Sequence, residues 1–336
     1  MSPSEERAPM NILFITGPGR SGTSAFANYL NKHPEILVCV ERYKWIRPEV
    51  TPSLFTYERI LDHRKRETNT RRDRHVSLLG KKDPTKLTWI GDKAPGYVKD
   101  ISIVAENNPR ARFVVMYRPI EEVVESYVAR SKDPGDRWLG GKNGFGLGIK
   151  DWNVAMRNTR EFVEAGMGRR TLIVDYNDFF HRNETCIPLV SRFLGIEFDE
   201  RIRDIWGRLS SRFENERRPK DSLSEEQKAL LQKRKDHAAE EWVLEHIQKQ
   251  RDEIGVEEEG VPPRGVRDGW REVAEELMRM EVAAQTARSR RLERRIEKLE
   301  EKIRPERERL SLVRNPAARK LLARLDRVRA KVMGKR

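Results

Sequence analysis

The sequence has few cysteines and no long apolar run. Its 336 residues include two cysteines, Cys39 and Cys186, and neither they nor the six histidines show zinc-ligand spacing. A disulfide framework and a structural zinc site are therefore not expected. No stretch approaches the roughly 18 apolar residues of a membrane span, and the first ten residues lack the apolar region of a signal peptide. We expect a cytoplasmic protein.

Charge, by contrast, is abundant. Charged residues make up 36% of the chain, against about a quarter in an ordinary globular domain, and the excess lies mainly after residue 200. The net charge of +14 favours an anionic partner: a nucleotide, an anionic acceptor, an acidic lipid surface or nucleic acid. Nucleic acid is not expected, because the chain has no recognition motif and no basic stripe interleaved with aromatic residues.

Apolar segments alternate with helical patterns in the first two thirds of the chain. Strands are predicted at Asn11–Thr16, Ile36–Val40, Arg112–Tyr117 and Thr171–Val174. Helices are predicted after the first strand, from about Ile120, at Asp151–Ala165 and at Ile187–Leu194. This alternation predicts an α/β fold, a three-layer sandwich with a central parallel sheet.

Two polar regions interrupt this pattern. Residues 48–92 are basic and without a persistent period, so we interpret them as an insertion near the site rather than as core. Residues 132–150 are rich in glycine and are interpreted as a long mobile loop, which could be a lid, an acceptor-binding element or a plain linker.

The composition changes near residue 222, so we predict one domain over residues 1–221 and a charged helical extension over 222–336. Ser224 and Gln227 suit a capping box at the start of the first helix of this extension. Apolar spacing over residues 292–303 suits a short coiled coil that could mediate self-association. The basic tail, residues 313–336, could contact an anionic membrane or form a solvated helix.

A glycine-rich loop joins the first strand to the first helix. It reads GPGRSGTS over residues 17–24, and its backbone N–H groups and the helix end would converge on an anion. The glycines fit the P-loop spacing GxxxxG, but Thr23 stands where nucleoside triphosphatases have a lysine, and the cation is Arg20 instead.

The loop and its continuation, GPGRSGTSAFANYLNKHPEILVCVE, resemble the 5′-phosphosulfate-binding segment of the sulfotransferases that use 3′-phosphoadenosine 5′-phosphosulfate (PAPS). The style of the motif is closest to the tyrosylprotein and heparan-sulfate-like branch and to bacterial carbohydrate sulfotransferases. The resemblance implies a P-loop fold, a sulfotransferase domain over residues 1–221, and PAPS as co-substrate with 3′-phosphoadenosine 5′-phosphate (PAP) as product. It assigns the 5′-phosphosulfate contacts to Arg20, Ser21, Gly22, Thr23 and Ser24.

A second segment, ARFVVMYRPIEEVVESYVAR, resembles the family's 3′-phosphate-binding region. It implies that Arg118 and Ser126 bind the 3′-phosphate, although Arg118 could instead pair with Glu121 or Glu122. Arg218, in the patch RRPK, stands where related enzymes place a late loop over the same phosphate, and could equally be solvated.

The resemblance also implies the catalytic residues Glu41, Arg20 and Lys93. Glu41 follows the second strand at the family's general-base position, and Lys93 belongs to GDKAPGY, which resembles a family element but has Ala94 where Ser or Thr is usual. Lys93 and Arg20 would stabilise charge on the leaving group, and no metal would be required. A surface glutamate and an exposed turn lysine are the alternatives.

We therefore predict sulfuryl transfer from PAPS to an acceptor hydroxyl or amine. The expected acceptor is a carbohydrate, lipid or small metabolite rather than a protein, and the basic residues over 64–74 either favour an acidic acceptor or contact nothing. The alternatives are a P-loop kinase or nucleoside triphosphatase and a non-catalytic nucleotide-binding scaffold.

Overall fold

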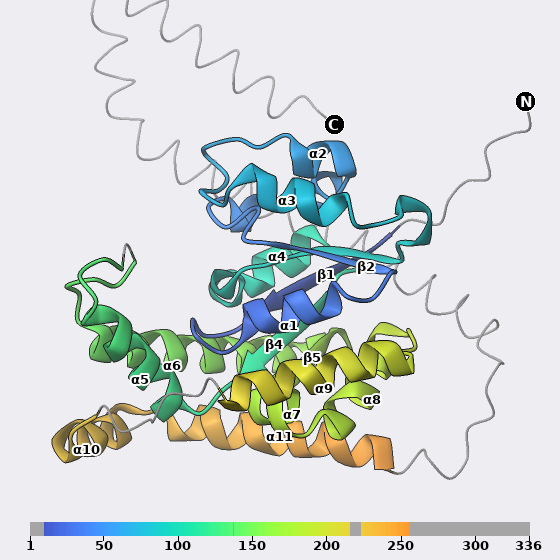
Figure 1. Cartoon of the computed structure of the whole chain (residues 1–336). Helices are drawn as coiled ribbons and strands as arrows, with labels where there is room; N and C mark the ends of the chain where they lie inside the picture. Colours follow the sequence, from blue (N-terminus) through green and yellow to red (C-terminus); the bar gives the residue numbers. More distant parts are fainter. Residues whose placement is uncertain (1–9, 137, 216–222, 256–336) are drawn as a thin grey trace, which may run out of the picture. The chain divides into compact units, whose positions relative to one another are not determined.

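A five-stranded parallel sheet organises the part of the chain that this computed structural model describes, residues 10–136, 138–215 and 223–255 (Figure 1). The strand order is β2-β3-β1-β4-β5, and every neighbouring pair is parallel. The strands are β1 (Asn11–Thr16), β2 (Ile36–Val40), β3 (Trp89–Lys93), β4 (Arg112–Tyr117) and β5 (Thr171–Asp175).

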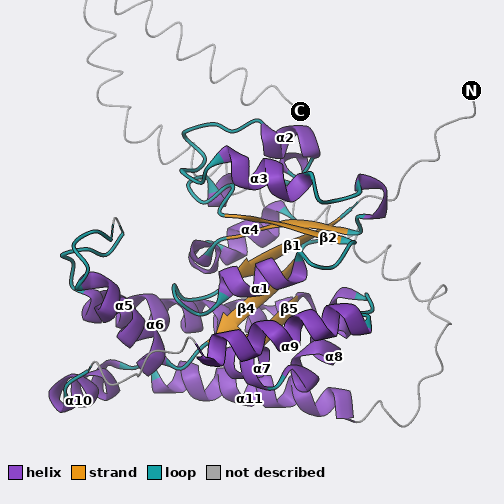
Figure 2. Ribbon diagram, in the orientation of Figure 1, coloured by secondary structure: helices purple, strands orange, loops and turns teal. Residues whose placement is uncertain are grey.

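Helices cover both faces of this sheet, as Figure 2 shows. The α-helices are α1 (Thr23–Leu30), α2 (Tyr57–Leu61), α3 (Arg72–Leu79), α4 (Ile101–Asn107), α5 (Ile120–Ser131), α6 (Gly144–Phe162), α7 (Tyr176–His181), α8 (Asn183–Leu194), α9 (Glu200–Asn215), α10 (Glu225–Arg234) and α11 (His237–Gly255). Because side chains alternate along a strand, Leu13 and Ile15 pack with residues of α1, α7, α8 and α9, whereas Ile12 and Phe14 pack with residues of α2, α3 and α4. The predicted three-layer α/β fold is confirmed.

Helices α10 and α11 contribute to the same packed body. Leu231, Val243 and Ile247 are buried in one cluster with residues of α5 and α6. The predicted capping box of Ser224 and Gln227 is present at the start of α10. The boundary at 221/222 stays a prediction, and the predicted coiled coil (292–303) and basic tail (313–336) lie outside the described residues. None of the described helices is both long and apolar enough to cross a membrane.

Strand β3, which lies between β1 and β2, was not predicted from the sequence. Its sequence, WIGDK, has only two apolar residues before Gly91, so it lacks the apolar run of a buried strand. Gly91 is needed because a Cβ there would lie 1.7 Å from the Leu13 carbonyl oxygen of β1. Close approach of two backbones, rather than hydrophobicity, distinguishes this strand.

Gly91→Ala should therefore destabilise the protein by about 3 kcal/mol or more, because the new Cβ overlaps backbone that side-chain movement cannot relieve. Urea denaturation measures this difference. Gly207→Ala in α9 is the matched control, since no atom lies within 4 Å of its added Cβ and alanine favours a helix. Equal stability of the two variants would contradict the close approach of β1 and β3.

Both polar regions contain more regular structure than predicted. Residues 48–92 hold α2 and α3 as well as β3, and they supply Val50, Phe55 and Ile60 to the core, so the interpretation as an insertion outside the core is wrong. Helix α6 begins at Gly144, inside the predicted loop over 132–150. Its glycines allow close packing on α5, because a Cβ on Gly144 would lie 2.5 Å from the Tyr127 carbonyl oxygen.

Candidate active site

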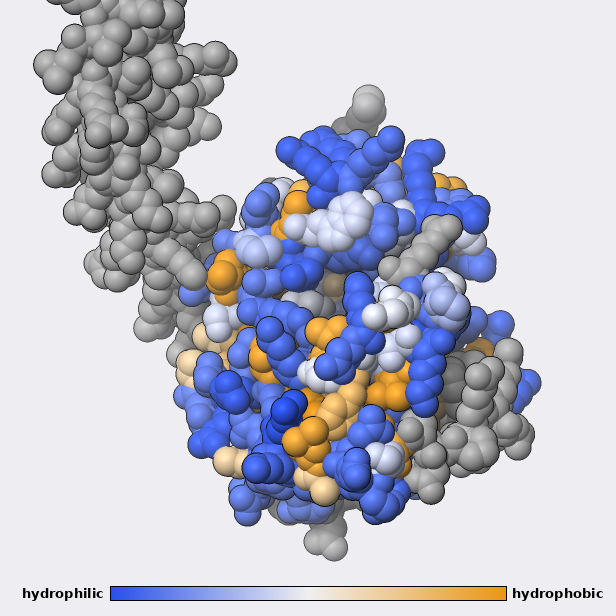
Figure 3. Space-filling model, turned by 90° about the vertical axis from the view of Figure 1, so that its left-hand side faces the viewer, coloured by the Kyte–Doolittle hydropathy of each residue, from blue (hydrophilic) through white to orange (hydrophobic). Residues whose placement is uncertain are grey.

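Most of the predicted site residues lie where the strands end, and Ser126 lies in α5. The glycine loop follows β1, Glu41 follows β2, Lys93 ends β3 and Arg118 follows β4. Open parallel sheets bind ligands at this carboxyl edge. The arrows of β1 and β4 point to the left-hand side of Figure 2, and that side, seen face on in Figure 3, is mostly hydrophilic with smaller hydrophobic patches.

The glycine loop leaves the start of α1 open. Gly22 precedes the helix with φ +84°, offers no side-chain cap, and is followed by a first turn without acidic residues. The N–H groups of a first helical turn have no partner within the helix and attract anions. A Cβ on Gly19 would lie 2.2 Å from the Tyr127 hydroxyl, so glycine keeps the loop close to α5. These features fit a phosphate group.

The hydroxyl side chains of this loop differ in exposure. Ser21 is buried and its Oγ donates to the Pro18 carbonyl oxygen at 2.8 Å, which closes the turn. Thr23 is also buried, whereas Ser24 is exposed at the start of α1. In this conformation Ser24 is the loop hydroxyl best placed to meet a ligand from solvent.

Arg20 links the two predicted anion sites. Its Nε donates to Ser126 Oγ at 3.0 Å, and its carbonyl oxygen accepts from Arg118 Nη1 at 2.7 Å. Arg118 also pairs with Glu122, as the alternative interpretation anticipated, and its guanidinium lies 4.1 Å from the centroid of the Tyr176 ring. Arg118 is therefore anchored by Glu122 while it still lies against the loop.

The cations around Arg20 outnumber the carboxylates that meet it. Loss of solvation and the charges of Arg130 and Arg118 lower the pKa of Arg20, and no carboxylate of the described residues pairs with it. An anion would relieve this repulsion. Tyr176 was not predicted from the sequence as a site residue. It contacts Arg118, which lies 58 positions earlier in the chain, so no local pattern could have shown the contact.

Glu41 and Lys93 form an ion pair. Lys93 Nζ lies 3.2 Å from Glu41 Oε1, and Lys44 Nζ lies 3.1 Å from Glu41 Oε2. Lys93 is 1% exposed, which rules out the exposed turn lysine, and Glu41 is 31% exposed. Burial raises the pKa of Glu41, but the charges of Lys93 and Lys44 outweigh it, so the pKa lies below its usual value. Burial lowers the pKa of Lys93, and the pair with Glu41 offsets only part of this.

Asp92 holds the backbone that presents Glu41. Glu41 has φ +56°, a conformation that residues other than glycine adopt rarely. The Asp92 carboxylate is fully buried and accepts from the N–H groups of Arg42 at 3.0 Å and Tyr43 at 3.1 Å and from the Tyr97 hydroxyl at 2.8 Å. Burial raises the pKa of Asp92 to about 6, despite these hydrogen bonds. Asp92 is thus a positioning residue for Glu41.

Two expectations about the site are not addressed by these contacts. Arg218 lies outside the described residues, and its role stays a prediction. Within residues 10–136, 138–215 and 223–255, no group of three His, Cys, Asp or Glu side chains could hold a metal ion. That the reaction requires no metal stays a prediction as well.

A glycine-rich loop that opens a helix, together with an acid and a lysine at the carboxyl edge of a parallel sheet, is typical of an enzyme that transfers a group from a nucleotide. The sequence of residues 13–200 matches the model of the sulfotransferase family. The chain belongs to this family, and the sequence-based identification of a sulfotransferase is confirmed.

Solved sulfotransferase structures resemble this chain at low sequence identity. The sulfotransferase domain of the curacin biosynthetic pathway is 17% identical, with 59% of this chain and 77% of that chain covered and a TM-score of 0.40. The sulfotransferase domain of the Synechococcus PCC 7002 olefin synthase is 15% identical, with 84% and 97% covered and a TM-score of 0.40. Retinol dehydratase, solved with retinol and PAP, is 13% identical, with 73% and 82% covered and a TM-score of 0.37. No curated protein matches the sequence.

Proposed function

We propose that this protein transfers a sulfuryl group from PAPS to an acceptor hydroxyl or amine, with Glu41 as general base. The bond between sulfur and the donor's phosphate oxygen breaks, a bond between sulfur and the acceptor atom forms, and the acceptor's proton passes to a Glu41 oxygen. The observation that carries this proposal is the pair of Glu41 with the buried Lys93, at the edge where the glycine loop also begins.

Two anion sites would hold the donor in register. PAPS would supply the sulfuryl group, and its anions require positive charge or hydrogen-bond donors at both ends of the nucleotide. The N–H groups that open α1 and the side chain of Ser24 suit the 5′-phosphosulfate, and Arg118 with Ser126 suits the 3′-phosphate. Arg20 contacts Ser126 directly, so it could serve either anion.

The charges around Glu41 suit its proposed role. The lowered pKa keeps the carboxylate ionised at neutral pH, and Lys93 holds its orientation. An acceptor hydroxyl would compete with Lys44, which is partly exposed, for one carboxylate oxygen. Lys93 would remain as a buried positive charge that stabilises the negative charge developing on the leaving phosphate. We propose a carbohydrate, lipid or small metabolite as the acceptor.

Calorimetric binding of PAP, beside ATP with magnesium, tests the donor. Wild type should bind PAP, and Arg118→Ala should weaken this binding by about 10- to 100-fold, because charge-assisted hydrogen bonds to a phosphate are lost. Arg110→Ala is the matched control, since Arg110 is exposed near the opposite end of β4 and its removal changes the net charge equally.

Three other results would contradict the proposal. Preference for ATP with magnesium would favour a kinase or nucleoside triphosphatase. No binding of either nucleotide would favour a scaffold. Equal weakening by the Arg110 and Arg118 variants would mean that net charge, rather than contact with Arg118, holds the nucleotide.

A further inference from the structure

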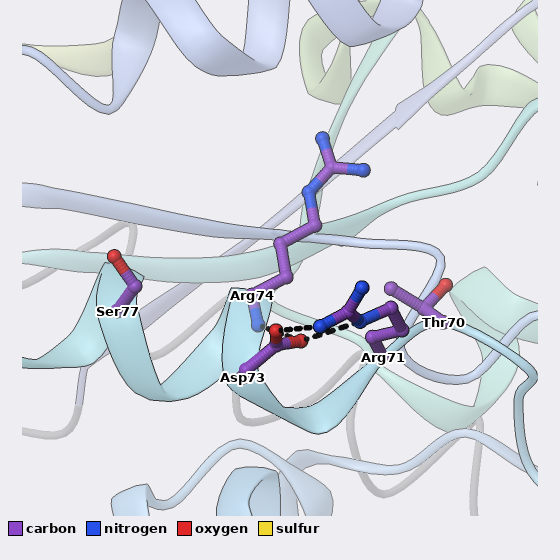
Figure 4. A pocket seen from close by; sticks show the side chains of 5 residues that line it. All are labelled: Thr70, Arg71, Asp73, Arg74 and Ser77. Atoms are coloured by element: carbon purple, nitrogen blue, oxygen red, sulfur yellow. Dashed lines mark hydrogen bonds and ion pairs between the residues drawn. The ribbon is translucent and has the colours of Figure 1, made fainter.

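A pocket beside the proposed base lies outside everything assigned to the donor. It is a shallow pocket of about 510 Å³, wide open to solvent and lined by Thr70, Arg71, Asp73, Arg74 and Ser77, all of them exposed except the half-buried Thr70 (Figure 4). These residues belong to α3 and the turn before it, the region that the sequence analysis had interpreted as an insertion.

The wall of the pocket is tied to Glu41. Thr68 Oγ1 donates to the Glu41 carbonyl oxygen at 2.6 Å, and Thr70 Oγ1 lies 3.4 Å from the same oxygen. On its other side α3 is anchored by the buried residues His75 and Leu79, and His75 Nδ1 lies 2.7 Å from His63 Nε2. The pocket therefore has a fixed relation to the proposed base.

The charge of the pocket is positive and incompletely paired. Arg71 forms an ion pair with Asp73, so two arginines and one aspartate leave one positive charge, on Arg74. The guanidinium of Arg74 makes no hydrogen bond or ion pair with any residue of the described ranges, and Figure 4 shows it extending away from the Arg71–Asp73 pair. Burial is the main reason that the pKa of Lys93 is lowered, and the charge of Arg74 adds to it.

The strand order places this pocket on the acceptor side. From β4 to β2 the edge of the sheet carries Arg118, the glycine loop, Lys93 and Glu41 in turn. The residues that line the pocket follow Glu41 in the sequence, at the β2 end of this edge. The donor sites occupy the β4 and β1 end, and an in-line transfer requires the acceptor to approach from the opposite side of the sulfuryl group. An anion in the pocket would therefore belong to the acceptor.

We propose that the acceptor carries an oxyanion group, a carboxylate, sulfate or phosphate, which Arg74 binds in this pocket with Thr70 and Ser77 while the acceptor hydroxyl meets Glu41. This inference rests on the proposed function, because it takes Glu41 as the base. It narrows the acceptor from any hydroxyl compound to an anionic one. Arg74 would be a specificity-determining residue.

The test is calorimetric binding of anionic probes and their neutral partners to the PAP-saturated full chain. The isosteric pairs are glucuronate with glucuronamide and 4-hydroxyphenylacetate with its amide, and glucose 6-sulfate and glucose 6-phosphate are compared with glucose. Wild type should bind at least one anionic member about 10-fold or more tightly than its neutral partner, and the carboxylate, sulfate and phosphate probes together identify the oxyanion. Arg74→Gln should reduce this preference to near unity.

Arg66→Gln is the control, because Arg66 is exposed in the turn between α2 and α3 but does not line the pocket. It should keep the preference, which separates contact from net charge. Equal binding of anionic and neutral probes by wild type, or a preference that Arg74→Gln retains, would overturn the inference. Failure of wild type to bind PAP would instead overturn the proposed function, and the same probes without nucleotide would still decide whether the pocket selects anions.

Discussion

Glu41→Gln should reduce kcat by about 10²-fold or more while PAP affinity is unchanged. Glutamine keeps the shape of the side chain but accepts no proton, so an acceptor hydroxyl would lose its general base. The donor contacts at the glycine loop and Arg118 lie on other strands and would remain. The measurement is transfer of ³⁵S from labelled PAPS to the acceptor that wild type sulfates, at saturating concentrations of both.

A matched variant separates this effect from a general loss of carboxylate. Glu35 immediately precedes β2, whereas Glu41 immediately follows it, so Glu35→Gln removes the same charge at the opposite end of the same strand. It should leave kcat unchanged. Full activity of the Glu41→Gln enzyme would eliminate Glu41 as the base.

Lys93→Met should have an effect of similar size on kcat, about 10²- to 10³-fold, with a changed pH profile. The variant lacks the buried positive charge near the leaving phosphate, and such preorganised groups contribute about this much. Lys86→Met is the control, because Lys86 is exposed before β3 and Lys93 ends it.

The pH dependence follows from the direction of each pKa shift. Burial raises the pKa of Glu41, but nearby charges, that of Lys93 foremost, lower it below 4.5. As the pH falls, wild type should therefore keep its full kcat/KM until the pH is below 4.5. Without Lys93 the pKa of Glu41 rises, and the acid limb of the profile should move to higher pH. As the pH rises, the activity of wild type should begin to fall before pH 10.5, because burial lowers the pKa of Lys93. This alkaline limb of the profile should disappear in the Lys93→Met variant. An unchanged profile would mean that Glu41 and Lys93 do not control the reaction together.

Four of the five strands could be predicted from the sequence because each carries its own apolar run. The predicted segments at 11–16, 36–40 and 112–117 match β1, β2 and β4, and β5 extends one residue beyond the predicted end at Val174. Strand β3 could not be predicted in this way, since its Gly91 records the approach of the β1 backbone rather than a buried side chain. The start of α6 was missed for the same reason: glycine at Gly144 serves close packing on α5 and resembles a loop signal in isolation.

The candidate site divides along the same line. Residues 17–24 by themselves predict a loop that can bind an anion, because the glycines and the start of a helix are consecutive in the chain. The ion pair of Glu41 with Lys93 spans 52 positions, and the hydrogen bond from Arg118 to Arg20 spans 98. Both depend on which strands are neighbours. Only the tertiary structure decided that Lys93 is buried against Glu41 and that Arg74 faces an open pocket beside it, because the register of β2 with β3 and the packing of α3 bring these residues together.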